Sequence, residues 1–504
     1  MHSEIPILSI LIWLPVLTAV VVLTFGDHRA NAARWITLAS SIISMIFCIV
    51  MWVGFNDGTS HMQFMEHASW IPTYNINYDL GVDGISMPMV VLTCFTTLIV
   101  ILGSWTMVSE RVAQYLATFL IMQGMVVGVF AAMDSMLFYF FWEAMLMPMY
   151  ISIGVWGGKN RSYAAMKFFI YTFLGSALML IALLYLRLHS NSFEIGSFYQ
   201  LHMSLETQKL VFWAFLFAFA IKVPMWPVHT WLPDAHTAAP TGGSVVLAAL
   251  MLKLGAYGFL RFSLPVVPDA CRYYVWLMVG ISLMSIVYIG LVAIVQKDMK
   301  RLIAYSSVAH MGFVTLGCFM IFVILQKTGN VHDAYMSMEG GVVQMISHAF
   351  GSGAMFLAFG VLYRQMKTHN IADFGGIANK MPFLAAFFML FALSNVGLPG
   401  TSGFVGEFMV LLSTVRANFW VTFAAGTTLV IGVAYTLWMY KRVFFGKVVN
   451  DKVASLKRIE PVEGLAFSLL SLGILWIGVY PNGLLNILHA SVDHLLKLSM
   501  VTKL

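Results

Sequence analysis

The chain has 504 residues, of which 60% are hydrophobic and only 10% are charged, and its formal net charge is +6. Soluble domains carry about 25% charged residues, so this composition excludes a mainly soluble protein. Because a membrane-spanning helix needs roughly 20 apolar residues, the length allows many crossings and leaves little sequence for a soluble domain.

Apolar runs separated by short polar breaks predict an all-α, polytopic membrane protein of about 14 transmembrane helices. The first run lacks the basic start and the small-residue cleavage site of a secretory signal, so we interpret it as a retained helix. The expected spans are residues 5–25, 34–54, 84–106, 113–131, 134–156, 163–187, 208–233, 241–262, 273–295, 302–324, 338–363, 382–418, 419–440 and 462–480.

The seventh and twelfth expected spans contain residues that interrupt a helix. The seventh holds Pro224 and Pro227, and the twelfth holds Gly397, Pro399 and Gly400. Proline removes an intrahelical hydrogen bond and clashes with the preceding turn. A broken helix inside the membrane is tolerated where it is buried in protein or lines a hydrated cavity. Both breaks therefore mark candidate functional positions.

Lysine and arginine are distributed unevenly between the two sets of loops. With the N-terminus placed outside, 17 of the 28 Lys and Arg residues fall on the cytoplasmic side and 8 on the outer side. Cytoplasmic loops carry an excess of these residues, so we expect an even number of helices with both termini outside. The loop from Asn56 to Asp83 contains no Lys or Arg, which is typical of an outer loop.

A weak internal repeat relates two parts of the chain. Four pairs of identical residues, among them Gly175 and Gly353 and also Tyr257 and Tyr435, share an offset of 178 residues. Five helices per copy is an odd number, so the second copy must be inverted in the membrane, as in many ion-coupled transporters. The expected divisions are residues 1–112 (helices one to three), 113–262 (first repeat), 273–446 (second, inverted repeat) and 447–504 (a cytoplasmic loop, helix fourteen and a C-terminal tail).

Four charged side chains are expected deep in the hydrocarbon, namely Glu143, Lys222, Lys253 and Glu407. A charge at the bilayer centre costs at least about 2.5–3.5 kcal/mol, so each must be paired, hydrated or neutralised, and such residues usually serve function. The alternative is a structural scaffold in which the buried charges only hold helices together.

The surroundings of these residues suggest a proton relay. Lys222 lies beside the first break, where unwound backbone can hold water, and its expected partner is Glu143. Lys253 is flanked by apolar residues and cannot reach the membrane surface from the middle of its helix. His310 and His348 lie in the tenth and eleventh spans, and histidine changes its charge near neutral pH.

No cofactor is expected in this chain. The cysteines Cys48, Cys94, Cys271 and Cys318 are too far apart for zinc or iron–sulfur ligand spacing. The sequence also lacks a Walker-type loop and a dinucleotide fingerprint after a strand. The energy for transport must therefore come from an ion gradient or from a partner protein.

Four segments together resemble the antiporter-like membrane subunits of proton-pumping NADH:quinone oxidoreductase (respiratory complex I), and most of all the subunit M group, counterpart of mitochondrial subunit four. The segments are FFWEAMLMPMY, KVPMWPVHTWLPDAHTAAPTGGSVVLAALMLKLGAYG, KRLIAYSSVAHMGF and LPGTSGFVGEF. The resemblance extends from about Asp79 to Gly446. Glu407 is the residue that separates the members, since the related subunits typically have Lys at this place.

The resemblance implies a path for protons through two half-channels, driven by quinone reduction elsewhere in the complex. The relay residues that it implies are Glu143 and Lys222 as an ion pair, Lys253 as the central relay, His310 and His348 as the bridge, and Glu407 at the outer exit.

The resemblance also implies partners and a location. We expect the other membrane subunits of complex I as partners, especially the neighbouring antiporter-like subunits, in a bacterial inner membrane. NADH, FMN, iron–sulfur clusters and quinone are expected on partner subunits, and no nucleic acid is expected. The alternative is a subunit of a sodium/proton antiporter, which would share nearly all these residues, but Glu407 argues against it.

Overall fold

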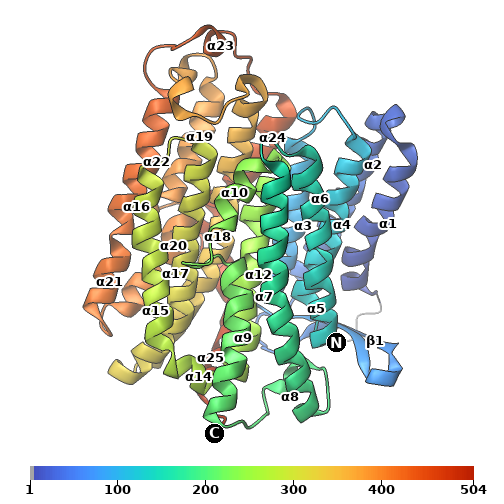
Figure 1. The fold of residues 1–504 in the computed structure, drawn as a ribbon, viewed down its shortest axis with the longest axis vertical. Helices are drawn as coiled ribbons and strands as arrows, with labels where there is room; N and C mark the ends of the chain where they lie inside the picture. The colour runs from blue at the N-terminus through green and yellow to red at the C-terminus, as the bar shows by residue number, and fades with distance from the viewer. Residues whose placement is uncertain (1–4) are drawn as a thin grey trace.

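Long helices packed side by side form nearly the whole chain in a computed structural model that describes residues 5–504 (Figure 1). Twelve helices are long and apolar enough to cross a membrane, which confirms the expected helical, polytopic membrane protein. The helices of the first quarter are α1 (Ile7–Phe25), α2 (Ala30–Gly54), α3 (Ser86–Gly103) and α4 (Val112–Ala131).

The next helices lead to the first break and past it. They are α5 (Ser135–Ala144), α6 (Leu146–Trp156), α7 (Arg161–Ser190), α8 (Ile195–Phe198), α9 (Leu205–Lys222), α10 (Trp231–Ala238), α11 (Thr241–Val246), α12 (Leu252–Gly258) and α13 (Leu264–Val266). Two π-helical segments, Leu247–Met251 and Phe259–Ser263, join α11, α12 and α13 into one continuous helix.

The remaining helices make up the second half of the bundle and the C-terminal region. They are α14 (Pro268–Tyr273), α15 (Val275–Leu283), α16 (Ile289–Ile294), α17 (Met299–Thr328), α18 (Val331–Met366), α19 (Pro382–Asn395), α20 (Ser402–Thr414), α21 (Phe419–Gly426), α22 (Thr428–Phe444), α23 (Asp451–Ala454), α24 (Pro461–Val479) and α25 (Asn482–Met500).

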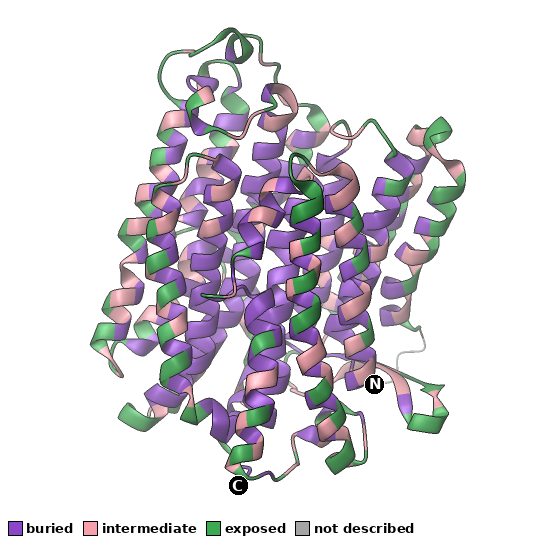
Figure 2. Cartoon of the chain, viewed as in Figure 1, coloured by how far each residue is buried: buried purple, intermediate pink, exposed green. Residues whose placement is uncertain are grey.

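The most buried helices lie at the centre of the bundle (Figure 2). The segment Thr241–Val266 is completely buried over its apolar window, and α17 and α18 are 94% buried. By contrast, only 39% of the apolar window of α1 and 33% of that of α2 are buried. The exposed surface of both helices is apolar, as a surface that faces lipid must be. Polar side chains inside the bundle therefore have only protein or internal water as partners.

Both predicted breaks are present in the structure. Helix α9 ends at Lys222 and α10 begins at Trp231, and likewise α19 ends at Asn395 and α20 begins at Ser402. The second break needs two glycines, because Gly397 and Gly400 adopt φ values of 75° and 89° that other residues rarely reach.

The fold is not entirely α-helical as expected, because the loop between α2 and α3 contains a β-hairpin. Strands β1 (Gln63–Ile71) and β2 (Ile76–Val82) pair antiparallel. The carboxylate of Glu66 accepts hydrogen bonds from the backbone N–H groups of Leu8 (2.7 Å) and Ser9 (3.1 Å). It thereby satisfies donors in the first turn of α1 that have no partner within the helix.

The C-terminal tail is also more ordered than expected, because it forms helix α25. Its residue Ser491 accepts a hydrogen bond of 2.8 Å from the Gly84 N–H. A Cβ atom on Gly84 would lie only 2.0 Å from the Ile487 carbonyl oxygen, so the two segments are in close backbone contact. This helix is amphipathic rather than uniformly apolar, and a search for long apolar runs therefore misses it.

A buried ion pair joins the start of α3 to the long central helix. Arg261 contacts Asp83, and the two residues are only 8% and 3% exposed. Tyr257 accepts a further hydrogen bond of 3.0 Å from the Arg261 Nε–H. The pair fixes the hairpin segment against the centre of the bundle.

Asp83→Asn should therefore lower the thermal midpoint of the purified protein in detergent. The substitution leaves Arg261 buried without its counter-charge, and removing one partner of a buried pair costs about 3–5 kcal/mol. The matched control is Glu206→Gln, since Glu206 is 82% exposed and pairs with Lys209 on the surface. We expect that control to change stability by about 0–1 kcal/mol. Equal midpoints for the two variants would contradict a stabilising role for the Asp83–Arg261 pair.

Candidate functional site

Lys222 is the last residue of α9, and its side chain is buried. The helix ends here because the prolines at positions 224 and 227 follow and cannot continue its hydrogen bonding. Lys222 is 1% exposed, and its Nζ has no hydrogen-bond partner. The Nζ lies 4.2 Å from the ring centroid of Trp142, so the aromatic face provides the attraction that a carboxylate would otherwise supply.

Glu143 does not form the expected ion pair with Lys222. Within residues 5–504 no salt bridge joins the two side chains, and the Glu143 Oε1 is buried without a hydrogen-bond partner. Successive side chains on a helix point about 100° apart, so Trp142 contacts Lys222 while Glu143 interacts with Ser176. The two charges still attract each other over a longer distance.

Lys253 lies at the centre of the bundle and is 0% exposed. Its Nζ donates a hydrogen bond to the Ala248 carbonyl oxygen, five residues earlier, at the π-helical turn. The same Nζ lies 2.6 Å from Nδ1 of His348 on α18. Insertions of this kind in a helix occur frequently at functional sites, and here the turn provides an acceptor for a buried ammonium group.

His310 and Glu407 form a second buried contact. The His310 Nδ1 lies 2.6 Å from Glu407 Oε1, and both side chains are 5% exposed. Gln344 donates a further hydrogen bond of 2.9 Å to the same carboxylate oxygen. The ring centroids of His310 and His348 lie 5.8 Å apart. Lys253, His348, His310 and Glu407 therefore form one row, which we call the relay row.

A small cavity lined mostly by polar residues lies between the two imidazole rings and the second break. Its volume is about 10 Å³, and His310, His348, Gln344 and Asn395 are among its lining residues. A water molecule needs roughly 10–15 Å³, so the cavity has room for about one. The Nε2 atoms of both histidines are buried without a protein partner, and a water in this cavity would satisfy such atoms.

His236 and Lys300 are two buried groups that sequence reasoning did not place in the site. Both ring nitrogens of His236 lack a hydrogen-bond partner, and its ring stacks on Phe356 at 4.4 Å. Lys300 is 4% exposed, and its Nζ donates a 2.6 Å hydrogen bond to the Ala239 carbonyl oxygen. Lys300 resembles a loop anchor in the sequence, because it stands directly before an apolar run.

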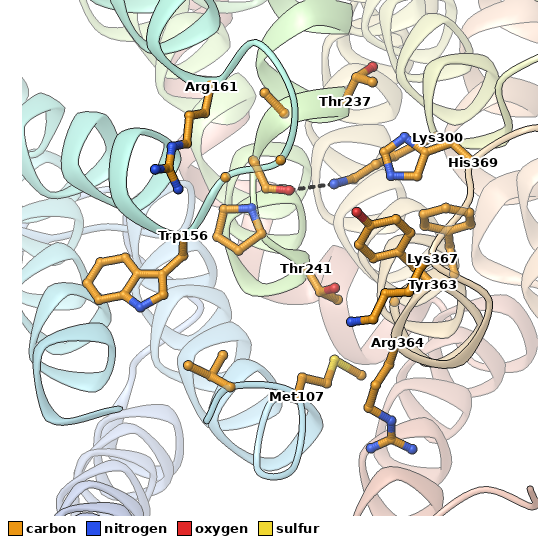
Figure 3. Close-up of a pocket in the computed structure, with 18 of the residues that line it drawn as sticks. Met107, Trp156, Arg161, Thr237, Thr241, Lys300, Tyr363, Arg364, Lys367 and His369 are labelled. Carbon is orange, nitrogen blue, oxygen red and sulfur yellow. Dashed lines mark hydrogen bonds between the residues drawn. The ribbon is translucent and has the colours of Figure 1, made fainter. Parts of the chain in front are cut away.

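Lys300 lines a cavity of about 340 Å³, which we call the vestibule (Figure 3). The vestibule lies at the end of the bundle where Lys and Arg are concentrated. Arg161, Lys367 and His369 also line it. His236 interacts electrostatically with both Lys300 and Lys253. His236 is therefore within electrostatic reach of one residue that lines the vestibule and one residue of the relay row.

Close backbone packing places the end of α9, which carries Lys222, against α12, which carries Lys253. A Cβ atom on Gly255 would lie 2.6 Å from the Phe219 carbonyl oxygen and 2.9 Å from the Lys222 Cβ. Only glycine fits this contact between α12 and the end of α9. No group of three or more His, Cys, Asp or Glu side chains that could hold a metal ion is found among residues 5–504.

Gly255→Ala should push the end of α9 away from α12. Overpacking of this kind typically costs about 1–3 kcal/mol, so we expect a lower thermal midpoint in detergent. The matched control is Gly280→Ala, because a Cβ atom on Gly280 meets nothing within 4 Å. Alanine also has the higher helix propensity, so the control should be at least as stable as the unmodified protein. A Gly255→Ala protein as stable as the control would show that the contact is not tight.

Two family models match the chain. One is described as NADH:quinone oxidoreductase/Mrp antiporter, TM, and matches residues 132–432. The other is described as NADH-ubiquinone oxidoreductase chain 4, amino terminus, and matches residues 8–131. Between them the two models account for most of the chain.

Curated relatives match over nearly their whole lengths. The chain is 42% identical to NADH-quinone oxidoreductase subunit M of Rickettsia prowazekii, with 98% of this chain and 99% of that protein covered. It is 44% identical to subunit M of Rhodobacter capsulatus, with 97% and 96% covered. It is 39% identical to NADH-ubiquinone oxidoreductase chain 4 of Marchantia polymorpha, with 97% of each covered.

Solved structures share the fold. A chain in respiratory complex I from Thermus thermophilus with bound NADH matches with a TM-score of 0.87 at 29% identity, covering 98% of this chain and 100% of that one. A chain of the Mrp complex from Dietzia sp. matches with a TM-score of 0.81 at 20% identity, covering 96% and 52%. The second likeness shows the fold alone.

Proposed function

The chain belongs to the subunit M family of NADH-quinone oxidoreductase, and we propose that it carries protons across a bacterial inner membrane along the relay row. The expectation from its sequence motifs is thereby confirmed at the level of the family. The observation that supports the route is the pair of 2.6 Å contacts, Lys253 to His348 and His310 to Glu407, inside a fully buried part of the bundle.

Fourteen crossings in two inverted repeats fit this architecture. The pairs α9/α10 and α19/α20 each count as one broken crossing, in addition to the twelve unbroken spans. The broken crossing is the fourth of five helices both in residues 113–262 and in residues 273–446. Both ends of the described chain lie at the same end of the bundle (Figure 1), as an even number of crossings requires.

In the first half of the path, Lys222 receives a proton and passes it toward Lys253. The conformation described here is the open one, in which Lys222 rests on Trp142 and Glu143 is apart from it. When Glu143 moves to Lys222, its negative charge favours the ammonium form. When the pair opens, that stabilisation is lost and the proton moves on. The contact at Gly255 connects this event mechanically to the helix of Lys253.

In the second half, each histidine receives a proton at one ring nitrogen and releases one from the other. The Lys253 ammonium gives a proton to His348 Nδ1, and the His348 Nε2 releases its own proton into the small cavity. His310 accepts that proton at Nε2 and delivers one from Nδ1 to Glu407. Imidazole suits this task because its two nitrogens can exchange the roles of donor and acceptor.

Redox chemistry belongs to partner subunits in this proposal. NADH, FMN, the iron–sulfur clusters and quinone are bound elsewhere in the complex, and quinone reduction opens the Glu143–Lys222 pair through neighbouring membrane subunits. A sodium/proton antiporter subunit remains the second candidate, because the matching family model names both classes. Co-purification with flavin- and iron–sulfur-containing subunits supports the first candidate, and their absence from a native purification supports the second.

Glu407→Gln should block proton pumping, because it removes the proton acceptor at the end of the relay row and keeps its shape. Glu407→Lys restores a group that can gain and lose a proton, so we expect part of the activity to return. The measurement is proton pumping per NADH oxidised in native membrane vesicles, after equal assembly has been confirmed. Glu206→Gln, on the surface, serves as the control and should pump normally. If Glu407→Gln also pumps normally, Glu407 is structural and the proposed path is wrong.

The topology proposal has its own test. A reporter fused after Lys457, in the loop before α24, should be cytoplasmic, and one fused after Leu504 should lie outside, because 17 of the 28 Lys and Arg residues fall on the proposed cytoplasmic side. Alkaline phosphatase and green fluorescent protein report the two sides in opposite ways. Both reporters on one side, or the reverse arrangement, would overturn the proposed crossings.

A further inference from the structure

We propose that the proton leaves the protein from Glu407 through Glu339, Tyr335 and His489, and that Glu339 is a proton-transfer residue between the relay row and the outer surface. The inference rests on the proposed function and deepens it, because the relay row itself ends inside the bundle. Glu339 lies on α18, the helix that also carries His348.

Glu339 is a buried carboxylate at the end of the bundle where the termini lie. It is 5% exposed, and no Lys or Arg side chain within residues 5–504 pairs with it. Its Oε1 accepts a hydrogen bond of 2.7 Å from the Tyr335 hydroxyl and lies 3.9 Å from His489 Nδ1. Ionisable side chains inside membrane-spanning helices are costly to bury and usually serve function, and here, in the part of the chain that the structure describes, the only nearby group that can become a cation is the imidazole of His489.

Tyr335 and His489 extend this contact to the surface. The Tyr335 hydroxyl contacts His489 Nδ1, and the two rings meet edge to face at 4.7 Å. The His489 side chain is 69% exposed. One turn further along α25 lies Asp493, a carboxylate that acts electrostatically on Tyr335. The Tyr335 hydroxyl therefore connects a buried carboxylate to an exposed imidazole, and a surface acid lies nearby.

The connection inward to the relay row runs along α18. Gln344 holds the Glu407 carboxylate through its amide N–H, and its own Oε1 is buried without a hydrogen-bond partner. Five residues separate Gln344 from Glu339, which corresponds to a rise of about 7.5 Å along a helix. The two side chains also point about 140° apart around the helix axis, so in this proposal one or two water molecules bridge the step.

The proton balance of the outward step is simple. Protonated Glu407 releases its proton through water to Glu339. Glu339 then gives a proton to the Tyr335 oxygen while the Tyr335 hydroxyl hydrogen passes to His489 Nδ1. Tyrosine is neutral before and after the step, Glu339 becomes a carboxylate again, and His489 becomes an imidazolium that releases a proton from Nε2 to solvent.

The test is proton pumping per NADH oxidised by the assembled complex in native membrane vesicles, recorded between pH 6 and 8. Glu339→Gln keeps the size of the side chain and its contact with Tyr335 but cannot carry a proton. A positioned proton donor or acceptor typically contributes about 10²–10⁴-fold, so we expect pumping to fall at least ~10-fold. Glu339→Asp should restore much of it with a shifted pH profile, which a structural role would not produce. Glu206→Gln is the control for the same chemical change on the surface.

The remaining outcomes distinguish a failure of the proposed exit from a failure of the proposed function. If Glu339→Gln pumps normally while Glu407→Gln is blocked, this exit is wrong and the proposed function stands. If Glu407→Gln pumps normally, the proposed function itself fails. Should Glu339→Gln prevent assembly, Tyr335→Phe decides, since it removes the hydroxyl and keeps the ring. The exit is supported if the assembled Tyr335→Phe complex loses pumping and His489→Gln is also impaired. Normal pumping in Tyr335→Phe overturns the exit.

Discussion

The architecture depends on one constraint, which is that an ammonium group at the centre of the bundle must find partners without water from outside. Lys253 cannot reach either membrane surface, and its Nζ is satisfied by the Ala248 carbonyl and by His348. The first partner requires a π-helical turn in the helix of Lys253 itself, and the second requires a histidine on α18. Helix α18 packs against α11 and the π-helical turn, so the same contact that supplies the carbonyl acceptor also brings His348 to Lys253.

The two broken crossings place polar backbone groups without helical partners in an apolar environment, where they need other hydrogen-bond partners. At the first break, the Trp231 indole donates to the Ile221 carbonyl, and Ser285 accepts from the Trp226 N–H. At the second, Asn395 donates to Thr436. At the first break two backbone groups are thus bonded to the side chains of Trp231 and Ser285, and at the second break a bond between side chains joins α19 to α22. The cost of breaking a helix is offset by contacts that also fix the positions of Lys222 and Glu407.

Much of the site could be predicted from the sequence because charged residues are rare in long apolar runs. Each of the six relay residues interrupts such a run or lies beside a proline or glycine break, and the structure brings four of them into contact. The Glu143–Lys222 pair could not be settled in this way, since helix periodicity does not show that Trp142 faces the lysine. Lys300 and Glu339 escaped notice because both lie near the ends of their helices, where a charge looks like an anchor. The β-hairpin and α25 escaped because neither has a long apolar run, and their partners lie far away in sequence.

The hairpin also constrains the order in which the chain is built into the membrane. The first turn of α1 gains its acceptor only from Glu66, which follows Ser9 by 57 residues in the chain. While α1 and α2 are being inserted, the N–H groups of Leu8 and Ser9 must therefore bond to water or lipid headgroups. They exchange these partners for the carboxylate only after the hairpin has folded beside them. The first helix therefore completes its hydrogen bonding only after the loop between α2 and α3 has been synthesised and has folded on the same side of the membrane as the start of α1.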